Sequence, residues 1–321
     1  MKDIRVGFVG IVVAGLLVGT GCSSAGSETG AGSGKGATTR PAPTGSTTAP
    51  AASTVPEPLA DQTPPSTING LTLQGDTLWV ASIEDDEVLQ VDADSGAILR
   101  RIDTHGAGPD DVAVAPDGSV WTAGFANGDL GRIDPDGTYQ VVHHIEVGLN
   151  PIEFGSDGML YVGTSGKLGK LYALITDGGA PVAGFSPKAV VQWLPDINAF
   201  AVLDDGTLVA PAGGLTGPSG AVRIDPAKGT VTPIVTGLPA VAAGAADAHG
   251  VPYLLANITG EIIRIDVEAK TSEVVETVRK GVPFDNLAFA PDGTVYVSSF
   301  VDPTITVVAP DGVERVLSIG S

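Results

Sequence analysis

The sequence predicts an all-β fold, a six-bladed β-propeller with four antiparallel strands in each blade. Three observations predict it. A short apolar stretch that follows a tight Gly-containing turn recurs six times between residues 66 and 321, as LWVAS, VWTAG, LYVGT, LVAPA, PYLLA and VYVSS. The turns are 40 to 48 residues apart. Another apolar stretch precedes each turn, and two more follow each copy with turns between them, which makes the four strands of one blade.

The first 22 residues are expected to be a targeting segment. Lys2 and Arg5 precede an uncharged apolar run over residues 6–19, which is short for a membrane span and suits a secretory signal. The run ends in GTGCSS, where Cys22 is the only cysteine of the chain. The segment resembles a bacterial lipoprotein signal, which implies export and a lipid anchor on Cys22. Cleavage and secretion without a lipid, or an uncleaved anchor, are the alternatives.

Residues 23–65 are rich in Ser, Gly, Thr, Ala and Pro and contain almost no large apolar side chain. Such a segment buries too little surface to offset the entropy lost on ordering. We therefore expect a flexible tether over residues 23–65 and a propeller over residues 66–321.

The propeller region carries the whole net charge of −20, with 33 Asp and Glu against 13 Lys and Arg. A surface this acidic repels nucleic acid and anionic lipid and attracts cations. We expect a monomer that binds no nucleic acid, contacts the membrane only through its anchor and takes a small-molecule substrate or ligand. The absence of cysteine after Cys22 excludes disulfide and thiol chemistry in the mature domain.

The first strand of each blade is expected to begin at the mouth of the central channel. Counting back eight residues from each turn glycine selects the same position in successive blades, occupied by Asp110, Asn150, Asn198, Ala242 and Asp285. In the first blade the nearest polar residue is Asn69. Five of six blades therefore offer an Asn or Asp at one end of one channel. We interpret the Asp-Gly pairs of the turns, and Asp111, as local turn and strand-start residues.

Carboxylate and amide oxygens are ligands for a hard cation such as Ca²⁺. Two carboxylates near one axis repel each other, so they share a proton or hold a cation. The predicted site for Ca²⁺ or another divalent cation consists of Asn69, Asp110, Asn150, Asn198 and Asp285.

The strings NGLTLQGDTLWVAS at residue 69 and PDDVAVAPDGSVWTAGF at residue 109 resemble the strand pairs of the senescence-marker-protein/gluconolactonase propellers. RIDPDG is similar to segments of NHL-repeat and virginiamycin-lyase-like propellers. The gluconolactonase resemblance implies a channel metal, with Asn69 and Asp110 on the family's Asn and Asp ligands. The chain has TPPSTING where that family carries a Glu ligand, so Asp285 is the candidate for the second carboxylate.

Two functions of different classes follow. One is a metal-dependent hydrolase of small lactones or esters, with Asp110 or Asp285 as general base. The other is a non-catalytic propeller that binds a ligand or a protein; a virginiamycin-lyase-like lyase is a further alternative. Whether the chain is an enzyme stays open at this point.

Secondary candidates are expected on the mouth face. EDDE at residues 84–87 lies after a second strand, so Glu84 and Asp85 either form a solvated turn or add to cation attraction. His105 and His143 fall in mouth-face connections, where an imidazole near a metal can act as a base or be a surface residue. The sequence contains no G-x-S-x-G and no H-E-x-x-H motif.

Overall fold

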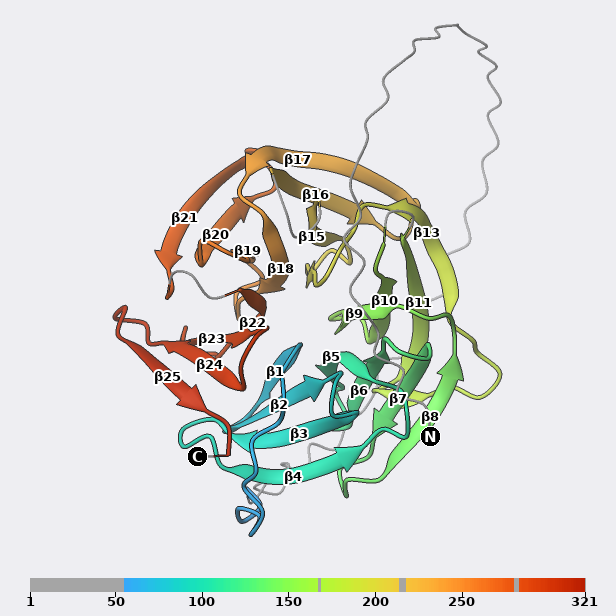
Figure 1. The fold of residues 1–321 in the computed structure, drawn as a ribbon. Helices are drawn as coiled ribbons and strands as arrows, with labels where there is room; N and C mark the ends of the chain where they lie inside the picture. The colour runs from blue at the N-terminus through green and yellow to red at the C-terminus, as the bar shows by residue number, and fades with distance from the viewer. Residues whose placement is uncertain (1–54, 167–168, 214–217, 280–282, 321) are drawn as a thin grey trace, which may run out of the picture. The chain divides into compact units, whose positions relative to one another are not determined.

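The computed structural model describes residues 55–166, 169–213, 218–279 and 283–320. These residues form six antiparallel sheets around one central channel, which confirms the six-bladed β-propeller (Figure 1). Each blade is continuous in sequence, and its first strand is the innermost. Within the described residues, no helix is long and apolar enough to cross a membrane. Cys22 and the predicted signal lie outside the described residues.

The strands of the first three blades have the following bounds. Blade one contains β1 (Leu71–Gln74), β2 (Thr77–Ser82), β3 (Glu87–Asp92) and β4 (Ile98–Asp103). Blade two contains β5 (Pro109–Val114), β6 (Val120–Gly124), β7 (Asp129–Ile133) and β8 (Tyr139–His144). Blade three contains β9 (Leu149–Phe154), β10 (Met159–Thr164), β11 (Gly169–Asp177), β12 (Ala180–Pro181) and β13 (Lys188–Leu194). The short β12 pairs back onto β11, so it extends the outer part of blade three.

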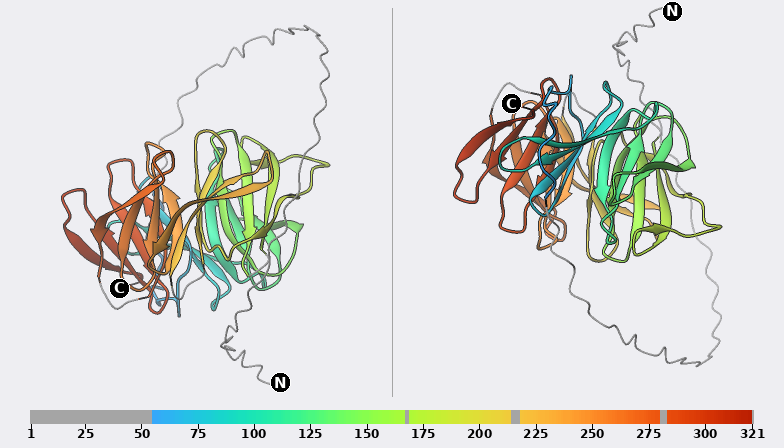
Figure 2. Two further views of the ribbon diagram at one scale, coloured as in Figure 1. Left: turned by 90° about the horizontal axis from the view of Figure 1, so that it is seen from above. Right: turned by 90° about the horizontal axis from the view of Figure 1, so that it is seen from below.

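The other three blades have four strands each. Blade four contains β14 (Ala201–Val202), β15 (Leu208–Ala212), β16 (Ser219–Asp225) and β17 (Thr230–Leu238). Blade five contains β18 (Val241–Ala246), β19 (Pro252–Ala256), β20 (Glu261–Asp266) and β21 (Thr271–Thr277). Blade six contains β22 (Phe284–Phe289), β23 (Val295–Ser299), β24 (Thr304–Val308) and β25 (Glu314–Ser318). Seen at right angles to the channel, the strands run between the two faces of the ring (Figure 2).

The core is divided into six apolar clusters, one between each pair of neighbouring blades. Successive side chains of a strand point to opposite faces of its sheet, and here each face packs on a different neighbour. In β2, for example, Leu78 and Val80 join the cluster shared with blade six, whereas Trp79 and Ala81 join the cluster shared with blade two. The second strands are therefore apolar on both faces, which explains the repeated strings.

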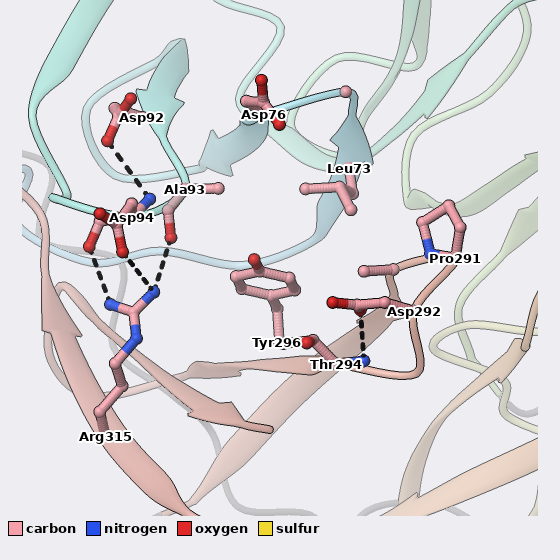
Figure 3. Close-up of a pocket in the computed structure, with 12 residues that line it drawn as sticks. Leu73, Asp76, Asp92, Ala93, Asp94, Pro291, Asp292, Thr294, Tyr296 and Arg315 are labelled. Carbon is pink, nitrogen blue, oxygen red and sulfur yellow. Dashed lines mark hydrogen bonds and ion pairs between the residues drawn. The ribbon is translucent and has the colours of Figure 1, made fainter. Parts of the chain in front are cut away.

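The ring closes without exchanging a strand between its first and last blades. At the seam, the Arg315 guanidinium of β25 donates hydrogen bonds to the carbonyl oxygens of Ala93, at 3.0 Å, and Asp94, at 2.9 Å (Figure 3). The Gly320 amide donates to Gly96 O at 3.0 Å. A cavity of about 390 Å³ lies beside this seam, between the turns of blades one and six.

Part of the segment that we assigned to the tether is ordered against blade one. The Leu59 amide donates to Ile98 O at 2.8 Å, and the Gln62 side chain both accepts from Ile98 N and donates to Ile98 O. Gln62 thus provides β4, an outermost strand, with an additional hydrogen-bond partner at its exposed edge. Contacts with the propeller begin before residue 66.

The Asp-Gly turns have the structural role expected from the sequence. Asp117 Oδ1 accepts a hydrogen bond from Ser119 N at 3.0 Å, and Asp205 Oδ1 accepts from Thr207 N at 2.9 Å. Gly118 has φ 83°, a conformation that glycine adopts without steric cost. The arginine of RID on the third strand then pairs with the turn aspartate, as Arg132 does with Asp117 at 2.8 Å.

Candidate functional site

The side chains at the channel mouth are positioned by irregularities at the start of the innermost strands. In β5 the pairing passes from Pro109–Gly124 directly to Asp111–Ala123, so Asp110 is an extra, bulged residue. A register shift occurs at the same place in β9, β18 and β22. A β-bulge bends its strand and redirects the side chains around it. In blades two, three and six the bulge accompanies a side chain, Asp110, Asn150 or Asp285, that contacts another blade.

Four of the predicted ring residues form one continuous hydrogen-bonded row. Asn150 Nδ2 donates to Asp110 Oδ2 at 2.7 Å and to Asn198 Oδ1 at 2.7 Å. Asn198 Nδ2 donates in turn to Asp285 Oδ1 at 3.1 Å. The row therefore passes from blade two through blades three and four to blade six. It bypasses blade five, where the corresponding residue is Ala242.

The two carboxylates of this row are buried, with Asp110 5% and Asp285 6% exposed. Burial, followed by repulsion from Asp285 and Asp111, raises the pKa of Asp110 well above its usual range. Burial also raises the pKa of Asp285 to about 6, against the opposing effect of the hydrogen bond from Asn198. The row thus holds two like charges whose ionised forms are mutually destabilising.

Asn69, the fifth predicted member, is buried at the start of blade one but is engaged within its own blade. Its Oδ1 accepts a hydrogen bond from Ile83 N at 3.2 Å, which ties the strand start to the loop after β2. The structure therefore places Asn69 on the mouth side of β1 and joins Asp110, Asn150, Asn198 and Asp285 directly.

A second polar contact lies beside the row and was missed in the sequence. Asn286 Nδ2 donates to Asp111 Oδ1 at 3.0 Å, and Ile152 N donates to Asp111 Oδ2 at 3.2 Å. Our interpretation of Asp111 as a local strand-start residue is wrong, because it connects blade two with blades three and six. Burial raises its pKa well above the usual range, although hydrogen bonds from Val112 N and Ile152 N oppose the shift.

Gly70 makes this contact across the channel sterically feasible. A Cβ on Gly70 would lie 2.1 Å from Asp111 Oδ1 and 2.6 Å from Asp111 Cα. The Gly70 amide also donates to Asp110 O at 2.7 Å. Blade one thus contributes its backbone at this position, and Asn286 reaches Asp111 past it. The signal in the sequence was the pair of adjacent polar residues, Asp-Asp in blade two and Asp-Asn in blade six.

The acidic loop EDDE is largely used to hold the mouth loops in place. Asp85 accepts hydrogen bonds from Ser66 N at 2.6 Å and Ser82 Oγ at 2.9 Å. Partial burial acts to raise the pKa of Asp85, but these hydrogen bonds hold it below its ordinary value. Asp86 accepts from Thr104 Oγ1 at 2.6 Å and Gly108 N at 2.8 Å. Glu84 is exposed.

The structure does not bring the predicted histidines to the row. His105 is exposed in the connection between β4 and β5, and its Nδ1 lies 3.0 Å from Asp103 Oδ1. His143 and His144 belong to β8, the outermost strand of blade two, and His144 Nδ1 lies 3.0 Å from Asp129 Oδ1. The carboxylates are therefore the groups of the row that can accept a proton from a substrate or water.

The donor set of the row fits a hard cation in part. It contains two carboxylates and two amide oxygens, which are the ligand types that Ca²⁺ takes. In the described part of the chain, no group of three or more His, Cys, Asp or Glu side chains is arranged to hold a metal ion. A cation between Asp110 and Asp285 would therefore depend on amide and solvent oxygens for its other ligands, while relieving the repulsion between the carboxylates.

The chain is similar to proteins of several activities. The family described as strictosidine synthase-like, N-terminal, matches residues 97–133. No curated protein sequence matches the chain. A catalytically inactive virginiamycin B lyase from Staphylococcus aureus with quinupristin is 14% identical, with a TM-score of 0.58, covering 82% of this chain and 87% of that one.

Two further solved structures share the propeller. Regucalcin from Agrobacterium tumefaciens, described as a calcium-binding protein, is 18% identical with a TM-score of 0.57, covering 74% of this chain and 83% of that one. A gluconolactonase from Xanthomonas campestris is 14% identical with a TM-score of 0.58, covering 74% and 84%. At these identities the comparisons confirm the resemblance at the level of the fold.

Proposed function

We propose that the chain binds a divalent cation, with Ca²⁺ as the expected ion, at the channel mouth and hydrolyses a small lactone or ester there. The observation that carries the proposal is the row Asp110–Asn150–Asn198–Asp285, which gathers two buried carboxylates and two amides from four blades. Buried like charges need a counter-charge or a shared proton. The calcium-binding and gluconolactonase descriptions of two propellers of the same fold support this choice.

In this proposal Asp110 and Asp285 hold the cation, with Asn150, Asn198 and Asn69 as candidate amide ligands. When bound, such a cation polarises a carbonyl group and lowers the pKa of water. The two carboxylates also supply the acid–base chemistry, since a carboxylate beside the cation accepts a proton from water or substrate. The amides orient the carboxylates, because each one donates to a carboxylate or to the next amide.

The side chains exposed on the mouth face and the net charge indicate the kind of substrate. Large apolar side chains are exposed on the loops and connections at this face, namely Phe125, Val147, Ile258, Phe300 and Val301. The apolar part of a substrate gains free energy where it covers such side chains. The net charge of −20 disfavours anions. We therefore propose a neutral or cationic ester or lactone that carries an apolar group.

Calorimetric titration of the full chain with Ca²⁺, followed by a panel of lactones and aryl esters, tests the proposal. We expect binding and turnover in the natural chain and the loss of both in the double variant Asp110→Asn, Asp285→Asn. Asp292→Asn is the matched control, because Asp292 lies in an exposed turn at the opposite face and accepts its hydrogen bond from Thr294 N. Absence of Ca²⁺ binding, or binding and turnover that survive the double variant, would overturn the proposal.

A non-catalytic binding propeller is the second candidate. It is favoured by one observation: the structure places none of the predicted histidines at the row, so the carboxylates would have to serve as both ligands and base. Ca²⁺ binding without turnover on the ester and lactone panel supports this candidate. A virginiamycin-lyase-like reaction is separated from hydrolysis by its products, because elimination leaves an alkene and adds no water.

We also propose that the protein is exported and anchored through a lipid on Cys22. The support is the sequence pattern alone. Expression of the full chain in a bacterium should give a membrane-associated protein, and Cys22→Ala should release it to the soluble fraction or retain the uncleaved signal. Unchanged mass and membrane association in Cys22→Ala would contradict lipidation.

A further inference from the structure

The channel contains a second polar feature at the end away from the mouth. Glu153, near the end of β9, lines a cavity of about 260 Å³. The other lining residues come from the innermost strands β1, β9, β14, β18 and β22 or lie directly before β14, so the cavity is on the channel axis. They lie toward the strand ends that lead into the first hairpin turns, on the face opposite the mouth.

The side chains that line this cavity are apolar apart from two. Glu153 is its only ionisable side chain, and Thr72 is the only other polar one. Three phenylalanines belong to the wall, Phe154, Phe200 and Phe289. Aromatic rings attract cations through their electron-rich faces, and apolar walls favour the hydrocarbon part of a ligand.

The Glu153 carboxylate has no cationic partner in the described part of the chain. Its Oε1 accepts a hydrogen bond from Phe154 N at 2.9 Å, and no Lys, Arg or His side chain of the described residues forms an ion pair with it. Glu153 is half-buried, and a carboxylate that is partly withdrawn from water is destabilised unless it is paired or protonated. Burial accordingly raises the pKa of Glu153 to about 7. The fold retains a group here that a bound cation would stabilise.

We propose that this cavity binds a small organic cation with an apolar body, whose ammonium group pairs with Glu153 and whose hydrocarbon part contacts the phenylalanines. A divalent metal does not fit, because a single carboxylate provides too few oxygen ligands. An anion is repelled, and a neutral apolar molecule leaves the carboxylate unpaired. The cavity equals about nine water molecules at ~30 Å³ each, so the occupant is a small molecule rather than a peptide.

This site is separate from the proposed mouth site. Asp111 and Asn286 lie between the mouth row and the cavity, as the hydrogen bond from Ile152 N to Asp111 Oδ2 places Asp111 next to the residue before Glu153. A ligand in the cavity therefore requires neither Asp110 nor Asp285. The two proposals can fail independently.

Calorimetry or ligand-detected NMR on the full chain at pH 8 tests the inference with three probes of similar shape: benzylammonium, benzyl alcohol and benzoate. We expect benzylammonium to bind at least about ten-fold more tightly than benzyl alcohol, and benzoate not to bind. Glu153→Gln should weaken benzylammonium at least about ten-fold without weakening benzyl alcohol. Glu314→Gln, on the exposed outer strand β25, is the matched control and should change nothing.

Two further variants keep the test decisive. Ala246→Leu, which fills the cavity without touching a charge, should abolish binding of benzylammonium and benzyl alcohol alike. Asp110→Asn with Asp285→Asn should leave benzylammonium binding intact, whatever it does to Ca²⁺. No binding of benzylammonium, equal affinity for the ammonium and the alcohol, or equal affinity in Glu153→Gln and Glu314→Gln would overturn the inference.

Discussion

Asn286 Nδ2 donates a hydrogen bond to Asp111 Oδ1 at 3.0 Å, although the two residues are 175 positions apart in the chain. The contact joins blade six to blade two and passes the backbone of blade one. It therefore helps to close the ring at its centre, while Arg315 and Gly320 close it at the seam. The same contact holds Asp111 beside the carboxylates of the mouth.

Gly70→Ala tests the close approach that this contact requires. The new Cβ would meet Asp111 Oδ1 and the backbone of Asp110 and Asp111, which cannot move without breaking the pairing of β5. We expect a loss of about 3 kcal/mol or more in the free energy of unfolding, measured by urea denaturation. Gly75→Ala is the control, since nothing lies within 4 Å of its Cβ position and only its φ of 59° opposes the change. It should cost about 1 kcal/mol; an equal cost at the two sites contradicts the packing argument.

Asn286→Ala removes the donor and leaves an oxygen of buried Asp111 without its partner from blade six. The expected loss is about 1–3 kcal/mol in the free energy of unfolding. Asn286→Asp places a second carboxylate against Asp111, so it should cost more than the alanine variant at pH 8 and recover part of that difference at pH 5. A loss below about 0.5 kcal/mol for Asn286→Ala would show that the hydrogen bond does not contribute to closing the ring.

Glu153 should make the fold less stable as the pH rises. Its pKa is about 7 in the folded protein against 4.5 for an unperturbed glutamate. Between these values the folded state binds more protons than the unfolded state, so the stability from the protonated carboxyl is present below pH 4.5 and lost as the pH rises through 7. Burial, with a smaller repulsion from Glu153, also raises the pKa of Asp111, so Asp111 contributes to the same loss of stability.

The variant Glu153→Gln separates that contribution from those of the buried acids Asp110, Asp111 and Asp285. It should gain about 1–3 kcal/mol over the natural chain at pH 8 and much less at pH 5, measured as the free energy of unfolding at each pH. Glu314→Gln should show no such difference. A gain that is the same at both pH values would mean that the charge of Glu153 is not the cause.

The fold was predictable from the sequence because each blade repeats the same pattern of apolar strands and turns. The second strands β2, β6, β10, β15, β19 and β23 fall on the repeated apolar strings, since each must be apolar toward two neighbouring blades. Most of the turns between the first and second strands were predictable from their Asp-Gly pairs, in which Asp accepts a backbone hydrogen bond and Gly adopts a positive φ. The outer part of blade three was harder to predict from the sequence. Its short strand β12 pairs only Ala180 and Pro181 with the end of β11, and two residues show no periodic pattern.

The sequence predicted which residues lie at the channel mouth, but not which way their side chains point. Counting from the turns located Asp110, Asn150, Asn198 and Asp285 because the blades share one geometry. Strict strand alternation, however, suggests that Asp111 points away from Asp110, and only the bulge in β5 explains why both make contacts between blades. Glu153 was missed for another reason: one acid in an apolar strand has no repeat to mark it, and its cavity is built by five blades.

The central claim is that Asp110 and Asp285 bind a cation at the mouth, and the most direct measurement is the thermal unfolding midpoint of the full chain with and without Ca²⁺. Binding at 100 times the dissociation constant stabilises the folded state by about 2.7 kcal/mol. That corresponds to a rise of about 5–10 °C for a domain of this size. We expect this rise in the natural chain and in Asp292→Asn, its reversal by chelator, and a change below about 1 °C in Asp110→Asn, Asp285→Asn. No rise in the natural chain, or an equal rise in the double variant, would contradict the account.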